Sequence, residues 1–148
     1  MVPRIARIGT NSKTLFASVL LGLLLAGGCT LFHEKEIAVS SISVTQTERL
    51  LESDTTVALL DVRTLEEWRS ETGHLKNALL IPIQDLEAHL SELTPYKNKT
   101  IIAYCRSGNR SQRAAKILAA RGFRVLNMEG GILRWNAEHL PVVNENGQ

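Results

Sequence analysis

Short runs of apolar residues recur along this chain of 148 residues, separated by longer segments that mix apolar with polar positions. The runs have the length of single strands, and polar residues do not alternate within them. Strands of this kind are usually parallel and lie in a sheet that is covered on both faces. The predicted strands are a short one at Ile42 and Val44, then 57–60, 78–81, 101–104 and 125–128.

The segments between these runs carry helix signals. Thr45 with Glu48, and Thr64 with Glu67, have the spacing of a capping box at a helix start. Gly122 is well placed to end a helix in the left-handed conformation. The alternation predicts an α/β fold, with a central, mostly parallel five-stranded sheet flanked by helices. The expected helices contain Leu50 and Leu51, then Trp68, then Leu86, Leu90 and Leu93, then residues 110–121 and 132–138.

The first 28 residues have the pattern of a secretory signal. They begin with Arg4, Arg7 and Lys13, contain no acidic residue, and continue in an apolar stretch too short to span a membrane well. Small residues directly before Cys29 resemble the bacterial lipoprotein processing site, although Ala26 stands where leucine is commoner. This resemblance implies cleavage before Cys29 and a lipid on its sulfur. An ordinary cleaved signal and an uncleaved anchor remain alternatives.

Three parts of the chain follow from this pattern. Residues 1–28 are the predicted lipoprotein signal peptide, 29–41 a lipidated tether and 42–148 one domain of ordinary size. The expected location is the bacterial cell envelope, with a lipid anchor on Cys29 and the domain facing the periplasm or the cell surface. The tether is mixed in charge and has no helical or strand period.

Charge and cysteine content narrow the function classes. Without residues 1–28, which hold three of the 17 basic residues and none of the 15 acidic ones, the balance is 14 against 15. This near-neutral charge gives no electrostatic case for nucleic acid. Cys29 and Cys105 are the two cysteines, so lipidation of one excludes a disulfide within the mature chain. The four histidines lack metal-ligand spacing, and we expect neither a metal nor a cofactor.

Cys105 ends a predicted strand and begins a short loop that leads into a helix. This arrangement directs backbone N–H groups at one point and favours thiolate over thiol there. A lone cysteine in this position is more often an inert core residue. However, an apolar core would reject the neighbouring Arg106 and Arg110, so the loop favours a nucleophile held in an anion-binding cradle.

Residues 105–111 (CRSGNRS) resemble the active-site loop of single-domain rhodaneses, a family of sulfurtransferases. Residues 61–68, 73–78 and 81–82 are similar to the family's upstream signature, and 130–135 to its closing signature. The resemblance covers about residues 42–143 and implies a rhodanese-like three-layer domain. It implies that Cys105 is catalytic, that Asp61 and Arg63 support the site, and that substrate is bound by the loop residues Arg106, Ser107, Gly108, Asn109, Arg110 and Ser111.

Loop length separates two chemistries that use such a loop. Cysteine phosphatases generally place five residues between the cysteine and an arginine, whereas four separate Cys105 from Arg110. The shorter loop suits one added sulfur atom better than a phosphoryl group. We therefore expect transfer of sulfur from a donor such as thiosulfate to a thiol, a protein acceptor or cyanide through a persulfide on Cys105. A non-catalytic anion-binding or partner-binding module is the main alternative, and a phosphatase or arsenate reductase the weaker one.

Individual roles within the site remain open from the sequence. Arg106 and Arg110 are candidates for donor binding, but Arg110 is equally suited to hold the loop or to pair with an acidic residue. Ser111 is expected to shape the loop and to cap the following helix. For Asp61 and Arg63 we favour a buried or half-buried ion pair that fixes the loop.

Overall fold

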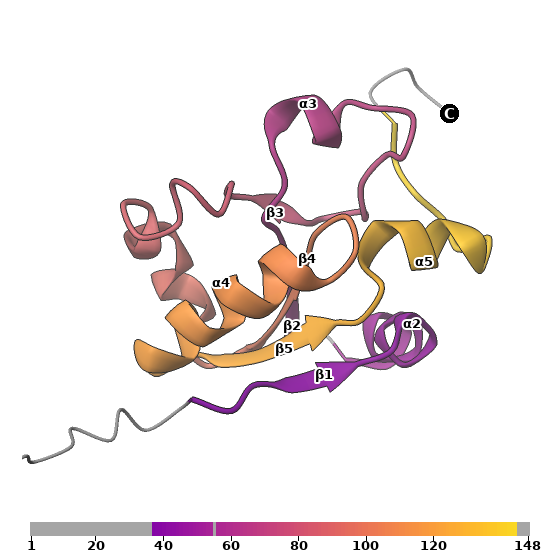
Figure 1. Cartoon of the computed structure of the whole chain (residues 1–148). Helices are drawn as coiled ribbons and strands as arrows, with labels where there is room; N and C mark the ends of the chain where they lie inside the picture. Colours follow the sequence, from indigo (N-terminus) through magenta and orange to yellow (C-terminus); the bar gives the residue numbers. More distant parts are fainter. Residues whose placement is uncertain (1–36, 55, 145–148) are drawn as a thin grey trace, which may run out of the picture. The chain divides into compact units, whose positions relative to one another are not determined.

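The computed structural model describes residues 37–54 and 56–144, and all four strand pairings in its five-stranded sheet are parallel, in the order β1-β5-β4-β2-β3 (Figure 1). This confirms the predicted α/β class. The strands are β1 (Ser40–Ile42), β2 (Val57–Asp61), β3 (Leu79–Leu80), β4 (Thr100–Tyr104) and β5 (Arg124–Met128). The helices are α2 (Val44–Ser53), α3 (Leu65–Trp68), the 3₁₀ helix η1 (Leu90–Tyr96), α4 (Asn109–Ala120) and α5 (Gly131–Ala137).

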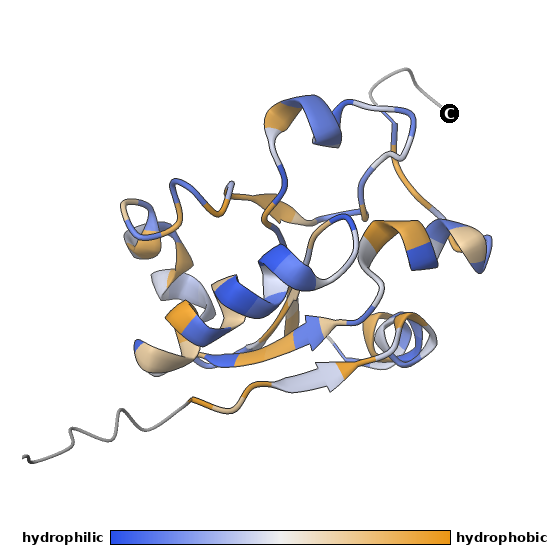
Figure 2. Ribbon diagram, in the orientation of Figure 1, coloured by the Kyte–Doolittle hydropathy of each residue, from blue (hydrophilic) through white to orange (hydrophobic). Residues whose placement is uncertain are grey.

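Two apolar cores lie on opposite faces of the sheet. Adjacent residues of β4 divide between them: Ile101 packs in one core with Leu118 of α4, and Ile102 packs in the other with Trp135 of α5. Successive side chains of a strand point to opposite faces, so a continuous apolar strand fills both cores. Figure 2 shows apolar residues along the central strands and hydrophilic residues where α4 begins. The three predicted layers are therefore present.

The bounds of β1 and the start of α2 differ from the prediction. Val44 is not in a strand but is the first residue of α2, and Ser40 and Ser41 of the predicted tether belong to β1. The capping box is formed by Ser43 and Gln46, not by Thr45 and Glu48. The Ser43 hydroxyl accepts from the Gln46 N–H, and the Gln46 side chain accepts from the Ser43 N–H. Two hydroxyl residues, Ser43 and Thr45, are possible N-caps, and burial of Val44 between them in the core fixes the start.

The segment around Leu86, Leu90 and Leu93 is not the α-helix that we predicted. It consists of turns followed by η1, and its backbone hydrogen bonds span three residues, as from Glu92 N–H to His89 C=O. Pro95 lies inside η1 and has no N–H to donate, which weakens an α-helix at this point. Leu86 and Leu93 are nevertheless buried, so the apolar spacing predicted burial correctly.

Other predicted elements agree with the structure. Thr64 and Glu67 form the capping box of α3, and Gly122 follows α4 with a φ of 79°. None of the helices within residues 37–54 and 56–144 is long and apolar enough to cross a membrane. The predicted signal peptide, the lipidation at Cys29 and most of the tether lie outside the described residues.

Candidate active site

The carboxyl ends of β2, β4 and β5 bring the predicted site residues to one edge of the sheet. Asp61 ends β2, Cys105 follows β4, and Gly130 follows β5 by two residues. These three strands are neighbours in the sheet, so the loops that follow them lie at the same edge (Figure 1). Ligands of open parallel sheets bind at this edge.

The sulfur of Cys105 is buried but is not surrounded by apolar groups alone. The Gly108 N–H donates to it over 3.2 Å, and the Ser111 hydroxyl lies 3.5 Å away. Gly108 has a φ of 100°, and this left-handed conformation, which favours glycine, lets the loop curl around the sulfur. Although the residue is only 1% exposed, polar hydrogens are therefore directed at the thiol.

These contacts determine the acidity of the thiol. Burial, the largest single influence, raises the pKa of Cys105. Hydrogen bonds from the Ser111 hydroxyl and from the backbone N–H groups of Ser111, Gly108 and Ser107 act in the opposite direction and together lower it below its ordinary value. Hydrogen bonds to the charged form favour the thiolate, which is the nucleophilic form of cysteine.

The first prediction concerns this acidity. Alkylation of Cys105 by iodoacetamide should slow as the pH falls, because protonation removes the thiolate, with a midpoint below that of an ordinary cysteine. Ser111→Ala removes one stabilising hydrogen bond, so the midpoint should move to higher pH and the rate at pH 7 should fall several-fold. Ser107→Ala keeps its N–H and should leave the profile unchanged. An equal shift of the alkylation midpoint in Ser111→Ala and Ser107→Ala would contradict a specific role of the Ser111 hydroxyl in lowering the pKa of Cys105.

Ser111 does not cap α4 as expected. The N-cap is Gly108, and Ser111 lies inside the helix, fully buried. Its hydroxyl lies 2.7 Å from the Asn127 side-chain oxygen on β5 and 3.1 Å from the Gly108 carbonyl oxygen. A hydroxyl has one proton, so Asn127 competes with the sulfur for it. The sequence analysis missed Asn127, and its only signal was one amide within an apolar strand.

Backbone N–H groups at the start of α5 bind the carbonyl groups of the loop 105–111, a contact that was not predicted from the sequence. The Ile132 N–H donates to the Cys105 carbonyl oxygen over 2.9 Å, and the Leu133 N–H donates to that of Arg106 over 3.1 Å. Gly131 has a φ of 56°, and a Cβ atom there would lie 2.3 Å from the Cys105 carbonyl oxygen. The adjacent glycines at 130 and 131 were a signal for this close approach.

Asp61 and Arg63 form a fully buried ion pair, the alternative that we favoured. The Arg63 guanidinium lies 2.7 Å from the Asp61 carboxylate, with side-chain exposures of 1% and 0%. Arg63 also donates to the carbonyl oxygens of Gly73 and Glu67 and to the Thr72 hydroxyl. The pair therefore ties the end of β2 to the segment around α3.

Arg110 pairs with an acidic residue, one of the two roles left open for it. Its guanidinium donates twice to the Glu67 carboxylate, over 2.6 and 2.5 Å. These bonds raise the pKa of Arg110, and the interaction with Cys105 acts in the same direction. Arg106, Ser107 and Asn109 are exposed at the loop surface.

His74 packs against Trp68, and its buried Nδ1 has no hydrogen-bond partner among the residues described. Its ring stacks on Trp68, with the ring centroids 3.6 Å apart, and its backbone pairs with Val143. Within the described part of the chain, no three side chains of His, Cys, Asp or Glu lie close enough together to hold a metal ion.

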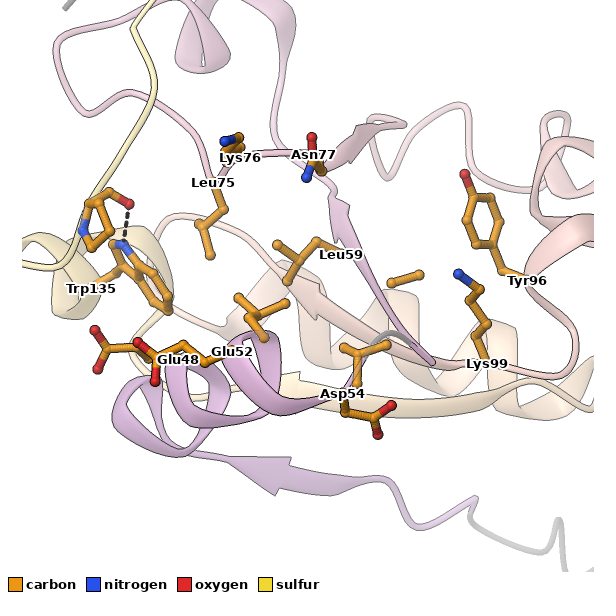
Figure 3. A pocket seen from close by; sticks show the side chains of 14 residues that line it. Glu48, Glu52, Asp54, Leu59, Leu75, Lys76, Asn77, Tyr96, Lys99 and Trp135 are labelled. Carbon is orange, nitrogen blue, oxygen red and sulfur yellow. Dashed lines mark hydrogen bonds between the residues drawn. The ribbon is translucent and has the colours of Figure 1, made fainter.

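A hollow of about 500 Å³ lies elsewhere on the domain, over β2 and beside α2. Figure 3 shows Glu48 and Glu52 on one wall and Lys76 on the other, with Leu59 and Leu75 between them. No residue of the loop 105–111 lines it. The candidate active site, the cup that the loop 105–111 forms around the Cys105 sulfur, is therefore separate from this hollow.

Comparison with known proteins bears on the activity. The family model of the rhodanese-like domain matches residues 43–138. A sulfurtransferase of Allochromatium vinosum is 38% identical over 92 residues, which are 62% of this chain and 82% of the relative. A putative sulfurtransferase of Bacillus subtilis, YtwF, is 33% identical over 103 residues, 70% of this chain and 96% of the relative.

A solved structure extends the likeness to three dimensions. The crystal structure of a rhodanese-related protein from Thermoplasma volcanium superimposes with a TM-score of 0.65 at 31% identity. The match covers 72% of this chain and 99% of that protein.

Proposed function

Because this chain belongs to the rhodanese-like domain family and has sulfurtransferases among its relatives, we propose that it transfers sulfur through a persulfide on Cys105. The observation that carries the proposal is the Gly108 N–H, which donates to the Cys105 sulfur, with the Ser111 hydroxyl 3.5 Å from the same sulfur. They favour a negative charge on sulfur, which both the resting thiolate and the persulfide carry.

The first half-reaction loads the cysteine. The Cys105 thiolate attacks the outer sulfur of thiosulfate, a new S–S bond forms, and the S–S bond within thiosulfate breaks. Sulfite leaves with the electron pair, and no external oxidant or reductant is needed. Arg106 is exposed beside the cysteine, and its guanidinium is suited to bind the anionic donor at the loop surface.

The second half-reaction unloads it. An acceptor thiolate or cyanide attacks the outer sulfur of the persulfide, and the S–S bond breaks so that the electron pair returns to Cys105. The product is a persulfide of the acceptor thiol or thiocyanate. The same N–H and hydroxyl donors stabilise the departing thiolate, so one set of groups serves both halves.

The tightness of the cup favours sulfur over phosphoryl transfer. Gly108 and Ser111 both lie close to the Cys105 sulfur, and α5 holds the carbonyl groups of the loop from behind. Loading adds one sulfur atom, whereas a phosphoenzyme would add a phosphorus atom with three oxygens.

Location in the cell envelope through a lipid on Cys29 is part of the same proposal and is supported by the sequence before Cys29.

Steady-state kinetics test this cycle. When thiosulfate is varied at several fixed cyanide concentrations, double-reciprocal plots should give parallel lines, because sulfite leaves before the acceptor reacts. The formation of thiocyanate provides the rate. Lines that intersect would require both substrates to be bound together and would contradict a persulfide intermediate. Turnover of a phosphoester in place of sulfur transfer would favour the phosphatase alternative.

A further inference from the structure

Arg110 has its carboxylate partner within the domain. Glu67, on α3, receives one hydrogen bond from each terminal nitrogen of the guanidinium, over 2.6 and 2.5 Å. The geometry is bidentate and matches the way in which an arginine binds a free oxyanion. An oxyanion that enters the cup therefore finds this edge of Arg110 already occupied.

Glu67 is held in position independently of Arg110. Its side chain accepts from the Thr64 N–H over 3.2 Å, and its own N–H donates to the Thr64 hydroxyl. Its carbonyl oxygen accepts from Arg63 and from Ser70. The buried ion pair of Arg63 with Asp61 thus fixes the backbone that presents the Glu67 carboxylate, and a bound anion must compete with a pre-placed group.

The carboxylate also changes the charge of the cup. Hydrogen bonds from Arg110 lower the pKa of Glu67 to about 2, so the side chain is ionised throughout the neutral range. It offsets the charge of Arg110, which interacts electrostatically with Cys105. Among residues 37–54 and 56–144, no carboxylate pairs with Arg106. The cup therefore presents less positive charge than its two arginines suggest.

We infer that Glu67 is a specificity-determining residue for the sulfur donor. By occupying Arg110 it disfavours dianionic donors such as thiosulfate relative to donors with one negative charge or none, of which small-molecule persulfides are the class that fits the chemistry. The inference rests on the proposed function. In this reaction the Cys105 thiolate attacks the outer sulfur of R–S–SH, and a new S–S bond to Cys105 forms. The S–S bond of the donor breaks, R–S⁻ leaves with the electron pair, and the outer sulfur keeps its proton or loses it to solvent.

The test compares Glu67→Gln with Glu66→Gln in the purified full chain. Glutamine has nearly the same size and serves equally in a capping box, so the exchange removes mainly the charge. The kcat/KM for thiosulfate should rise about tenfold in Glu67→Gln, as expected for one nearby charge at partial solvent exposure. With 2-mercaptoethanol persulfide as donor, kcat/KM should stay within about twofold, and inhibition by sulfite should become tighter. Glu66, the exposed neighbour, should change neither value.

Two outcomes would overturn the inference. An equal loss of kcat/KM for thiosulfate and for the persulfide in Glu67→Gln would show that Glu67 only supports the structure. An unchanged ratio of kcat/KM for the two donors in Glu67→Gln would show that the Glu67 carboxylate does not set the donor preference. Failure of the proposed function itself is distinguishable, because the unmodified chain would then transfer sulfur from neither donor.

Discussion

Replacing Cys105 by serine should lower the rate of thiocyanate formation from thiosulfate and cyanide by about 10³-fold or more. A serine hydroxyl remains protonated at neutral pH and cannot form a stable persulfide analogue. The Gly108 N–H, which donates to the sulfur in the native site, cannot compensate for the lost nucleophile. The measurement is the initial rate with both substrates in excess.

The control measurement for Cys105→Ser is thermal unfolding, which shows whether the variant still folds. Serine is smaller than cysteine, and its hydroxyl can accept the hydrogen bond from Gly108, so cooperative thermal unfolding should be retained within a few degrees of the unmodified chain. A folded variant that keeps more than about a tenth of the activity would exclude Cys105 as the sulfur carrier. If the unmodified chain binds thiosulfate but forms no thiocyanate, the non-catalytic anion-binding module becomes the better explanation of the domain's function.

Asp61→Asn should lower the free energy of unfolding by about 3 kcal/mol or more. The exchange keeps the shape of the side chain but leaves the guanidinium of Arg63 buried without its charge partner. Burial alone lowers the pKa of Arg63, and the hydrogen bonds and charge of Asp61 are what raise it above its ordinary value. Urea denaturation followed by circular dichroism measures the change.

Asp85→Asn is the matched control, because Asp85 is exposed. Its effect should stay within about 0.5 kcal/mol. A loss for Asp61→Asn as small as that of the control would show that the buried pair contributes little and that the end of β2 is held by other contacts. Arg63 also bonds to Gly73 and Glu67, so the Asp61 variant should loosen the segment that presents Glu67.

Much of the architecture follows from local pattern. The apolar runs at β2, β4 and β5 predicted buried parallel strands, because a sheet covered on both faces needs no alternation. Thr64 and Glu67 predicted the start of α3 to the residue, since both halves of that capping box lie within four positions. Cys105, at the end of a central strand before a helix, was placed correctly at the carboxyl edge of the sheet.

The remaining features depend on contacts between distant residues. Glu67 and Arg110 are 43 positions apart, and nothing local to either residue identifies the other as its partner. Asn127 is an isolated amide in an apolar strand until Ser111 is seen beside it. The N–H groups of α5 that hold the loop could be guessed only from two adjacent glycines. The spacing of Leu86, Leu90 and Leu93 predicts their burial, but it does not distinguish an α-helix from the turns and 3₁₀ helix that contain Pro95.

Intact-mass analysis of the purified chain tests the central claim most directly. After incubation with thiosulfate and removal of small molecules, the chain should gain the mass of one sulfur atom, located on Cys105 by peptide mapping. Subsequent addition of cyanide should return the original mass and release an equal amount of thiocyanate. No gain in mass, or a gain that cyanide does not remove, would contradict a persulfide carried on Cys105.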